Sequence, residues 1–151
     1  MRLTRRLLAA GMVALLLTAL FGSPARAASQ KLRLPPPCVV DYEVTTWATG
    51  FSADITVGNN WAPPGPPWFL KFDLPNGQNI TQTWNGGWVI PGSGSVTVAN
   101  PAWHPAIPTG TSFTVGFNAT LDGPYANATN FLFNELACEV NYVVKVISFD
   151  G

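Results

Sequence analysis

Charged side chains are scarce in this chain of 151 residues: Asp, Glu, Lys and Arg make up 11% of it, against about 25% in an ordinary soluble domain. Four of the eight Lys and Arg lie in residues 1–27, which hold no Asp or Glu. The remaining residues therefore carry four cations against eight anions, a net charge of −4. A protein with so few cations binds the phosphate backbone of a nucleic acid poorly, so we expect no nucleic acid partner.

Metal-ligating and catalytic residue types are equally scarce, with a single histidine, His104, and two cysteines. A zinc site needs more ligands than these supply, and a copper oxygenase would need a histidine at the mature N-terminus plus another. A glycosidase needs two carboxylates that flank one bond; Asp41 and Glu43 can share a strand face, but such acids usually only solvate a sheet. We expect no metal, no cofactor and no enzyme, with a weak hydrolase built around His104 left as an alternative.

Long apolar runs are limited to the N-terminus. A basic start at 1–6 precedes an apolar run at 7–21, and Ala25-Arg26-Ala27 has the small-x-small form of a signal peptidase site. This predicts a secretory signal peptide over 1–27, a mature chain that begins near Ala28, and an extracellular protein without a membrane association after cleavage. A membrane anchor is the alternative, for which the apolar run is short.

The two cysteines bracket most of the mature chain. Cys38 and Cys138 are 100 residues apart, and in an oxidising compartment we expect them to form a disulfide that joins the first strand to a late one. A lone reactive thiol is the alternative, and it would need a base placed beside it.

Apolar residues alternate with polar ones from residue 38 onward, and no mature segment has a helical period. Short runs of this kind, each ended by Gly, Pro or Asn, predict strands of an antiparallel β-sandwich with no second domain. Residues 28–37 form a proline-rich leader, 38–138 the main domain, and 139–151 a C-terminal extension that can add one more strand. The alternating positions are Val40, Tyr42 and Val44; Phe51, Ala53, Ile55 and Val57; Trp68, Leu70, Phe72 and Leu74; Phe113, Val115 and Phe117; and Val140, Tyr142, Val144 and Val146.

Six tryptophans in so short a chain call for an explanation. Trp68 falls on the buried face of its strand, whereas Trp47 continues the solvent-facing register of Asp41, Glu43 and Thr45. Trp84 shares a strand face with Gln82, and Trp103 lies between prolines, which argues against a central strand.

Exposed indoles on a soluble domain usually mark a binding site. A sugar ring fits them, because its C–H face is apolar and its hydroxyl rim matches Asn and Gln. One covered indole face contributes about 2 to 3 kcal/mol before the cost of association. A single ring therefore binds weakly, whereas a row of three can reach about micromolar affinity.

The order of short motifs over residues 38–138 resembles a bacterial family 2 carbohydrate-binding module, of the kind attached to secreted cellulases, xylanases and chitinases. The motifs are Cys38-x-Val40-x-Tyr42, Trp47-x-x-Gly50-Phe51, Gln82-x-Trp84-Asn85-Gly86, Val96-x-Val98-x-Asn100-x-x-Trp103, and Cys138.

This resemblance implies an immunoglobulin-like β-sandwich with bridged cysteines. It also implies a flat row of exposed tryptophans, Trp47, Trp84 and Trp103, which we call the tryptophan row. Gln82 and Asn85 match the family's flanking polar positions. A glycine at position 50 resembles the cellulose-binding members of the family, because members that bind xylan tend to carry a bulky basic residue there.

The sequence departs from the family at several positions. His104 stands where the family usually has Asn, and we expect it at the rim of the site, where it would hydrogen-bond sugar hydroxyls. Glu135 replaces a common Gly, and nothing in the family matches 139–151. Trp61 and Trp88 are extra aromatics expected in loops, where they either extend the row or, as we favour, pack on proline.

The sequence therefore predicts a secreted, monomeric, non-catalytic protein that stacks Trp47, Trp84 and Trp103 on insoluble polysaccharide, namely cellulose or chitin. An extracellular protein-interaction or adhesin module on the same sandwich is the alternative.

Overall fold

The computed structural model describes residues 33–92 and 94–147. The expected signal peptide, the first half of the expected leader (28–32) and residues 148–151 lie outside this part of the chain. No helix occurs in the described part, and accordingly none that is long and apolar enough to cross a membrane.

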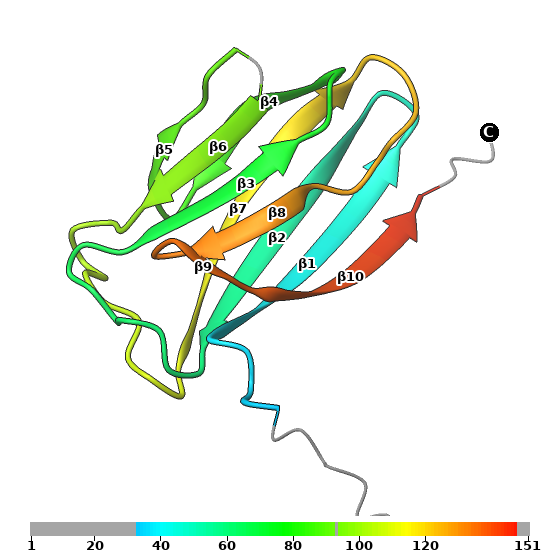
Figure 1. Ribbon diagram of the computed structural model, residues 1–151. Helices are drawn as coiled ribbons and strands as arrows, with labels where there is room; N and C mark the ends of the chain where they lie inside the picture. Colours follow the sequence, from blue (N-terminus) through cyan, green and yellow to red (C-terminus); the bar gives the residue numbers. More distant parts are fainter. Residues whose placement is uncertain (1–32, 93, 148–151) are drawn as a thin grey trace, which may run out of the picture. The chain divides into compact units, whose positions relative to one another are not determined.

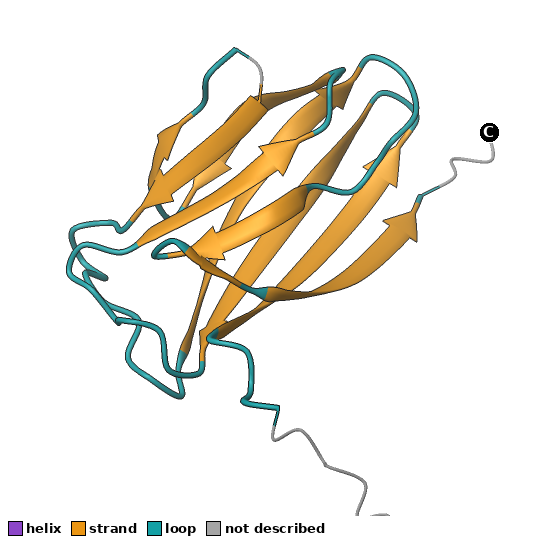
Figure 2. Ribbon diagram, in the orientation of Figure 1, coloured by secondary structure: helices purple, strands orange, loops and turns teal. Residues whose placement is uncertain are grey.

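Ten strands form two sheets that pack face to face as an immunoglobulin-like β-sandwich (Figures 1 and 2). One sheet has the order β10-β1-β2-β7-β4 and the other the order β5-β6-β3-β8-β9. The strands are β1 (Cys38–Trp47), β2 (Gly50–Asn59), β3 (Phe69–Leu74), β4 (Gln78–Trp84), β5 (Gly87–Val89), β6 (Gly94–Ala99), β7 (Ser112–Leu121), β8 (Thr129–Phe133), β9 (Leu136–Ala137) and β10 (Glu139–Val146).

The apolar members of the alternating runs in β1, β2, β3 and β7 meet between the sheets, whereas Tyr142, Val144 and Val146 of β10 are exposed. Trp68 is fully buried, which confirms the position that its strand face predicts. Aromatic rings from both sheets are in contact: Phe72 stacks on Phe117 with ring centroids 6.0 Å apart, and Tyr42 lies 5.5 Å from Phe131. Because these rings fill the interior, most polar residues of β1, β2, β7 and β4 face outward, and Thr46, Asn59 and Gln78 are the buried exceptions in the described part of the chain.

One strand pair departs from the antiparallel pattern. β10 runs parallel to β1, with Val39 opposite Glu139 and Thr46 opposite Val146. The Cys38–Cys138 disulfide joins the start of β1 to the residue just before β10. Since both strands begin at this bond and lie in one sheet, they run in the same direction.

The two-residue turn between β8 and β9 contains Glu135, which stands where the family commonly has Gly. Asn134 and Glu135 both have positive φ, 47° and 66°, as a type I′ hairpin turn requires. Glycine adopts this backbone conformation without strain, whereas Glu135 does not. The Glu135 carboxylate forms an ion pair with Lys71 at the surface.

We expect Glu135→Gly to raise the free energy of unfolding by about 1 kcal/mol, because relief of the backbone strain outweighs a surface ion pair. Urea unfolding measures the change, and Lys71→Ala is the control that removes the ion pair alone. A decrease in stability for Glu135→Gly that matches the Lys71→Ala decrease would show that the turn is not strained.

Candidate binding face

The outer face of the β10-β1-β2-β7-β4 sheet carries two of the candidate tryptophans. Trp47 is opposite Gly50 in the β1–β2 pair, and Trp84 is opposite Gly116 in the β4–β7 pair. Trp47 alternates with the buried residues of β1, so its side chain points away from the interior. Trp84 points outward because the register shift between Ile80 and Gln82 places it opposite Gly116, whose neighbours Val115 and Phe117 are buried. The strand face predicted for Trp47 is the one observed.

The indole of Trp84 lies directly against the backbone of Gly116. A Cβ atom added to Gly116 would overlap Cε2, Cζ2 and Nε1 of this ring, and no other atom comes as close. These contacts place the indole directly over the outer side of the Gly116 backbone. One face of the indole is therefore covered by glycine and the other is turned outward, which accounts for its half-buried state.

Trp47 covers Gly50 in the same manner. A Cβ on Gly50 would lie 3.1 Å from both Cζ2 and Nε1 of Trp47, and 2.6 Å from the carbonyl oxygen of Ala119. A larger residue at position 50 would displace both the ring and the neighbouring strand. This gives a physical reason for the glycine that the resemblance singled out.

Trp103 reaches the surface from the loop between β6 and β7. Its side chain is 67% exposed, and its ring packs edge-on against Phe113, 5.4 Å between centroids. The His104 ring stacks on the same phenylalanine at 4.1 Å. Phe113 thus holds Trp103 at the start of β7.

His104 has a different environment from the one expected. Its Nε2 is shielded from solvent and has no hydrogen-bond partner, and its carbonyl oxygen accepts a hydrogen bond from the indole of Trp68 (3.1 Å). In this position the ring supports the aromatic cluster around Phe113, and its Nε2 does not reach outward.

The three indoles follow the direction of β7. Trp103 contacts Phe113, Trp84 covers Gly116, and Trp47 covers Gly50, which pairs with Thr120. With a rise of about 3.4 Å per residue, these anchoring positions are about 10 Å and about 14 Å apart along the strand. Phe113 has the inward parity of Val115 and Phe117, so its contact places Trp103 at the end of the sheet beside the start of β7.

Amide side chains flank Trp84. Gln82 accepts a hydrogen bond at Oε1 from Nδ2 of Asn118 (3.1 Å), and Asn85 donates from Nδ2 to the carbonyl oxygen of Thr114 (3.1 Å). Gln82 can thus offer Nε2 as a donor and Asn85 can offer Oδ1 as an acceptor. Asn118 lies two residues from Gly116 on the same strand face, and although strand parity indicates this position, it was not among the residues predicted for the site.

The extra tryptophans have separate roles. Trp88 belongs to β5 and packs on Phe72 and Phe117 of the core, so its expected place in a loop against proline is wrong. Trp61 is 49% exposed, and its indole nitrogen donates to the carbonyl oxygen of Pro35 (2.8 Å) in the segment before β1.

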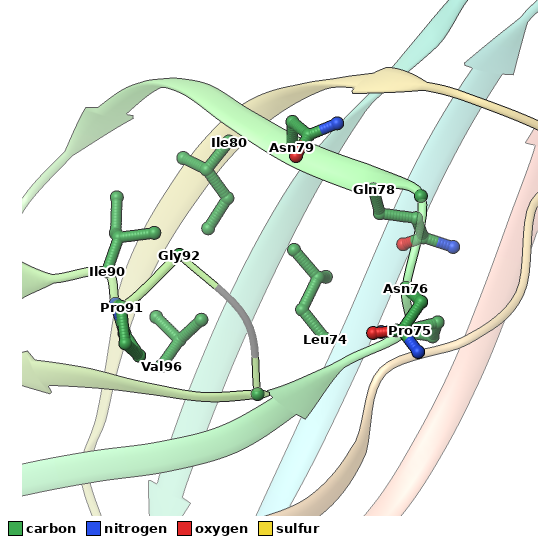
Figure 3. Close-up of a pocket in the computed structure, with 12 residues that line it drawn as sticks. Leu74, Pro75, Asn76, Gln78, Asn79, Ile80, Ile90, Pro91, Gly92 and Val96 are labelled. Atoms are coloured by element: carbon green, nitrogen blue, oxygen red, sulfur yellow. The ribbon is translucent and has the colours of Figure 1, made fainter.

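The candidate face does not coincide with a cavity. A cavity of about 160 Å³ opens between the β3–β4 turn and the segment from β5 to β6, where Leu74, Ile80 and Val96 line it (Figure 3). It includes none of the six candidate residues. Within the described ranges 33–92 and 94–147, no group of three His, Cys, Asp or Glu side chains could hold a metal ion.

Comparison with known families identifies the domain. The model of the family described as the cellulose binding domain matches residues 38–138. The chain belongs to this family. The match covers the sandwich from the start of β1 to the second cysteine, and β10 follows it.

Proteins that carry the cellulose binding domain are similar to this chain in sequence. Exoglucanase A of Cellulomonas fimi is 35% identical over 101 residues, which are 67% of this chain and 12% of the enzyme. A cellulose/chitin binding protein of Mycobacterium tuberculosis is 38% identical over 91 residues, which are 60% of this chain and 63% of that protein. The chain thus spans less than two thirds of either relative.

Solved structures of cellulose and chitin binding domains have the same fold. The family 2 carbohydrate binding domain of ScLPMO10C superposes with a TM-score of 0.52 at 26% identity, covering 69% of this chain and 99% of that one. The chitin-binding domain of Chi18aC from Streptomyces coelicolor gives 0.53 at 27% identity, covering 67% and 93%.

Proposed function

We propose that this protein is a secreted, non-catalytic polysaccharide-binding protein in which the tryptophan row stacks on the flat faces of pyranose rings in insoluble cellulose or chitin. The observation that supports the proposal is the close packing of Trp47 and Trp84 against Gly50 and Gly116 on the outer face of the sheet. Each glycine covers one indole face and leaves the opposite face for a ligand.

Energetics favour use of the whole row. One indole face covers about 100 Å² of sugar and contributes about 2.5 kcal/mol, whereas association costs several kcal/mol. No single ring overcomes that cost, so affinity requires the rings to act together on one extended chain. Gln82 and Asn85 then orient the chain through its hydroxyl groups.

The family and its relatives support this ligand class. The matching model is that of a cellulose binding domain, and the similar proteins include a cellulose/chitin binding protein, a chitin-binding domain and a cellulose-binding domain. Both polymers present the same flat pyranose faces, which is why we propose them together.

Depletion from solution by insoluble cellulose, chitin and xylan tests the proposal. We expect retention on cellulose or chitin. We expect Trp47→Ala and Trp103→Ala each to raise the dissociation constant from the binding isotherm about tenfold, because each removes one end of the row. Trp61→Ala is the matched control, since it deletes an exposed indole outside the row.

Full binding by both variants would reject the tryptophan row. Retention on none of the three polymers, together with capture by a protein ligand, would favour the adhesin alternative. Release of reducing sugar from any polymer would reject the non-catalytic assignment.

A further inference from the structure

β10 is a regular sheet edge whose outer side pairs with no other strand in the described part of the chain (Figure 1). It pairs with β1 at eight consecutive positions without a bulge. At the opposite edge of the sheet, β4 is interrupted between Ile80 and Gln82, and the edge strands of the second sheet have only three and two residues. Proteins usually blunt their edges with bulges, prolines or short strands, and β10 has none of these.

Apolar side chains gather on this edge. The exposed hydrophobic residues at the end of the chain's described part are Tyr142, Val143, Val144, Val146 and Ile147, and Val146 is 76% exposed. A cluster of this kind usually marks an interaction surface.

The direction of the backbone groups follows from one hydrogen bond. The N–H of Ile147 donates to the carbonyl oxygen of Thr46 in β1 (2.9 Å). Backbone groups of successive strand residues point to opposite sides, so those of Glu139, Asn141, Val143 and Lys145 also point toward β1. The backbone N–H and C=O groups of Val140, Tyr142 and Val144 therefore point outward.

We propose that β10 pairs antiparallel with β10 of a second copy of this chain, about a two-fold axis at Tyr142. This register puts Tyr142 opposite Tyr142 and Val140 opposite Val144, all with outward backbone groups, which gives about six hydrogen bonds between the copies. It also puts Glu139 opposite Lys145 at both ends. The edge is thus complementary to itself in hydrogen bonding, apolar contact and charge, as a two-fold interface requires.

Neighbouring registers lack this charge match. An axis at Asn141 puts Glu139 opposite Val143, and an axis at Val143 puts it opposite Ile147. Opposite charges across strands stabilise pairing, whereas like charges oppose it. In the free chain Lys145 lies 3.8 Å from Glu43, a long contact between exposed groups, so it can turn to Glu139 of the second copy.

The dimer replaces the monomer expected from the sequence, and it leaves the candidate binding face open. The tryptophan row lies on the broad face of the sheet, whereas the pairing uses the edge. Polysaccharide binding and self-association can therefore fail independently.

Sedimentation equilibrium of the purified protein at about 0.01 to 1 mM tests the pairing. We expect a concentration-dependent dimer. Glu139→Lys opposes Lys145 at both ends and should raise the dissociation constant at least about tenfold. The double variant Glu139→Lys/Lys145→Glu should restore dimerisation, and Asp54→Lys, the same charge change on the broad face, should not affect it.

Val144→Pro provides a second test that does not depend on charge. The Val144 N–H points away from β1, so proline removes an outward donor and keeps the β1 pairing. We expect a folded monomer, with the far-ultraviolet circular dichroism of the parent. A parent that stays monomeric throughout, or a dimer that survives both Val144→Pro and Glu139→Lys, overturns the proposal.

Discussion

Reduction of the Cys38–Cys138 disulfide is expected to lower the free energy of unfolding by about 4 to 5 kcal/mol. The bond closes a loop of 100 residues, and in the chain-entropy model a cross-link over that length removes much of the freedom of the unfolded chain. This is a large share of the 5 to 15 kcal/mol typical of a domain. Urea unfolding of the oxidised and reduced protein measures the difference.

The reduced parent is the better test molecule, because it keeps both sulfur atoms in place. Cys38 is fully buried, so Cys38→Ala/Cys138→Ala would add a cavity cost to the loss of the cross-link. We expect the double variant to be less stable than the reduced parent. A reduced parent within about 1 kcal/mol of the oxidised protein would show that strand pairing alone holds β1 and β10.

The strands and their buried faces were predictable because period two is a local signal. Val40, Tyr42 and Val44 alternate with polar residues, and all three are buried in β1. The direction of β10 was not predictable, because alternation is the same for parallel and antiparallel strands. The disulfide places the start of β10 beside the start of β1, so the two strands are parallel once they are neighbours in one sheet. The sequence pattern does not show that they are neighbours.

The tryptophans divide in the same way between local and long-range information. Parity placed Trp47 outward and Trp68 inward, and both assignments agree with the structure. Trp88 was misplaced because its strand, β5, has only three residues, too few for alternation to be detected. The burial of His104 Nε2 depends on Phe113, a contact that no local pattern reveals.

The support beneath Trp84 was also beyond local sequence reasoning. Gly116 is separated from it by 32 residues, and only the register of β4 against β7 shows that the glycine lies under the ring. A glycine inside a strand usually weakens it. Here the indole covers the exposed backbone, so the glycine and the tryptophan form one unit.

Trp84→Ala is expected to weaken binding to cellulose or chitin about 30-fold to 100-fold, more than loss of either end of the row. Trp84 is the central ring, and its removal separates the contacts of Trp47 and Trp103 as well as deleting its own 2 to 3 kcal/mol. Depletion isotherms on the polymer that retains the parent give the ratio.

Gly116→Ala tests the geometry without deleting the ring. The three atoms nearest to its methyl group would all belong to the Trp84 indole, so it should displace the ring and weaken binding almost as much as Trp84→Ala. In the Trp84→Ala background these three nearest contacts are absent, and Gly116→Ala should then leave binding unchanged. Gly50→Ala is unsuitable for this purpose, because its methyl group would lie 2.6 Å from the Ala119 carbonyl oxygen and would disturb the strand itself. Equal effects of Gly116→Ala in both backgrounds would mean that the position of Trp84 against Gly116 has no part in binding.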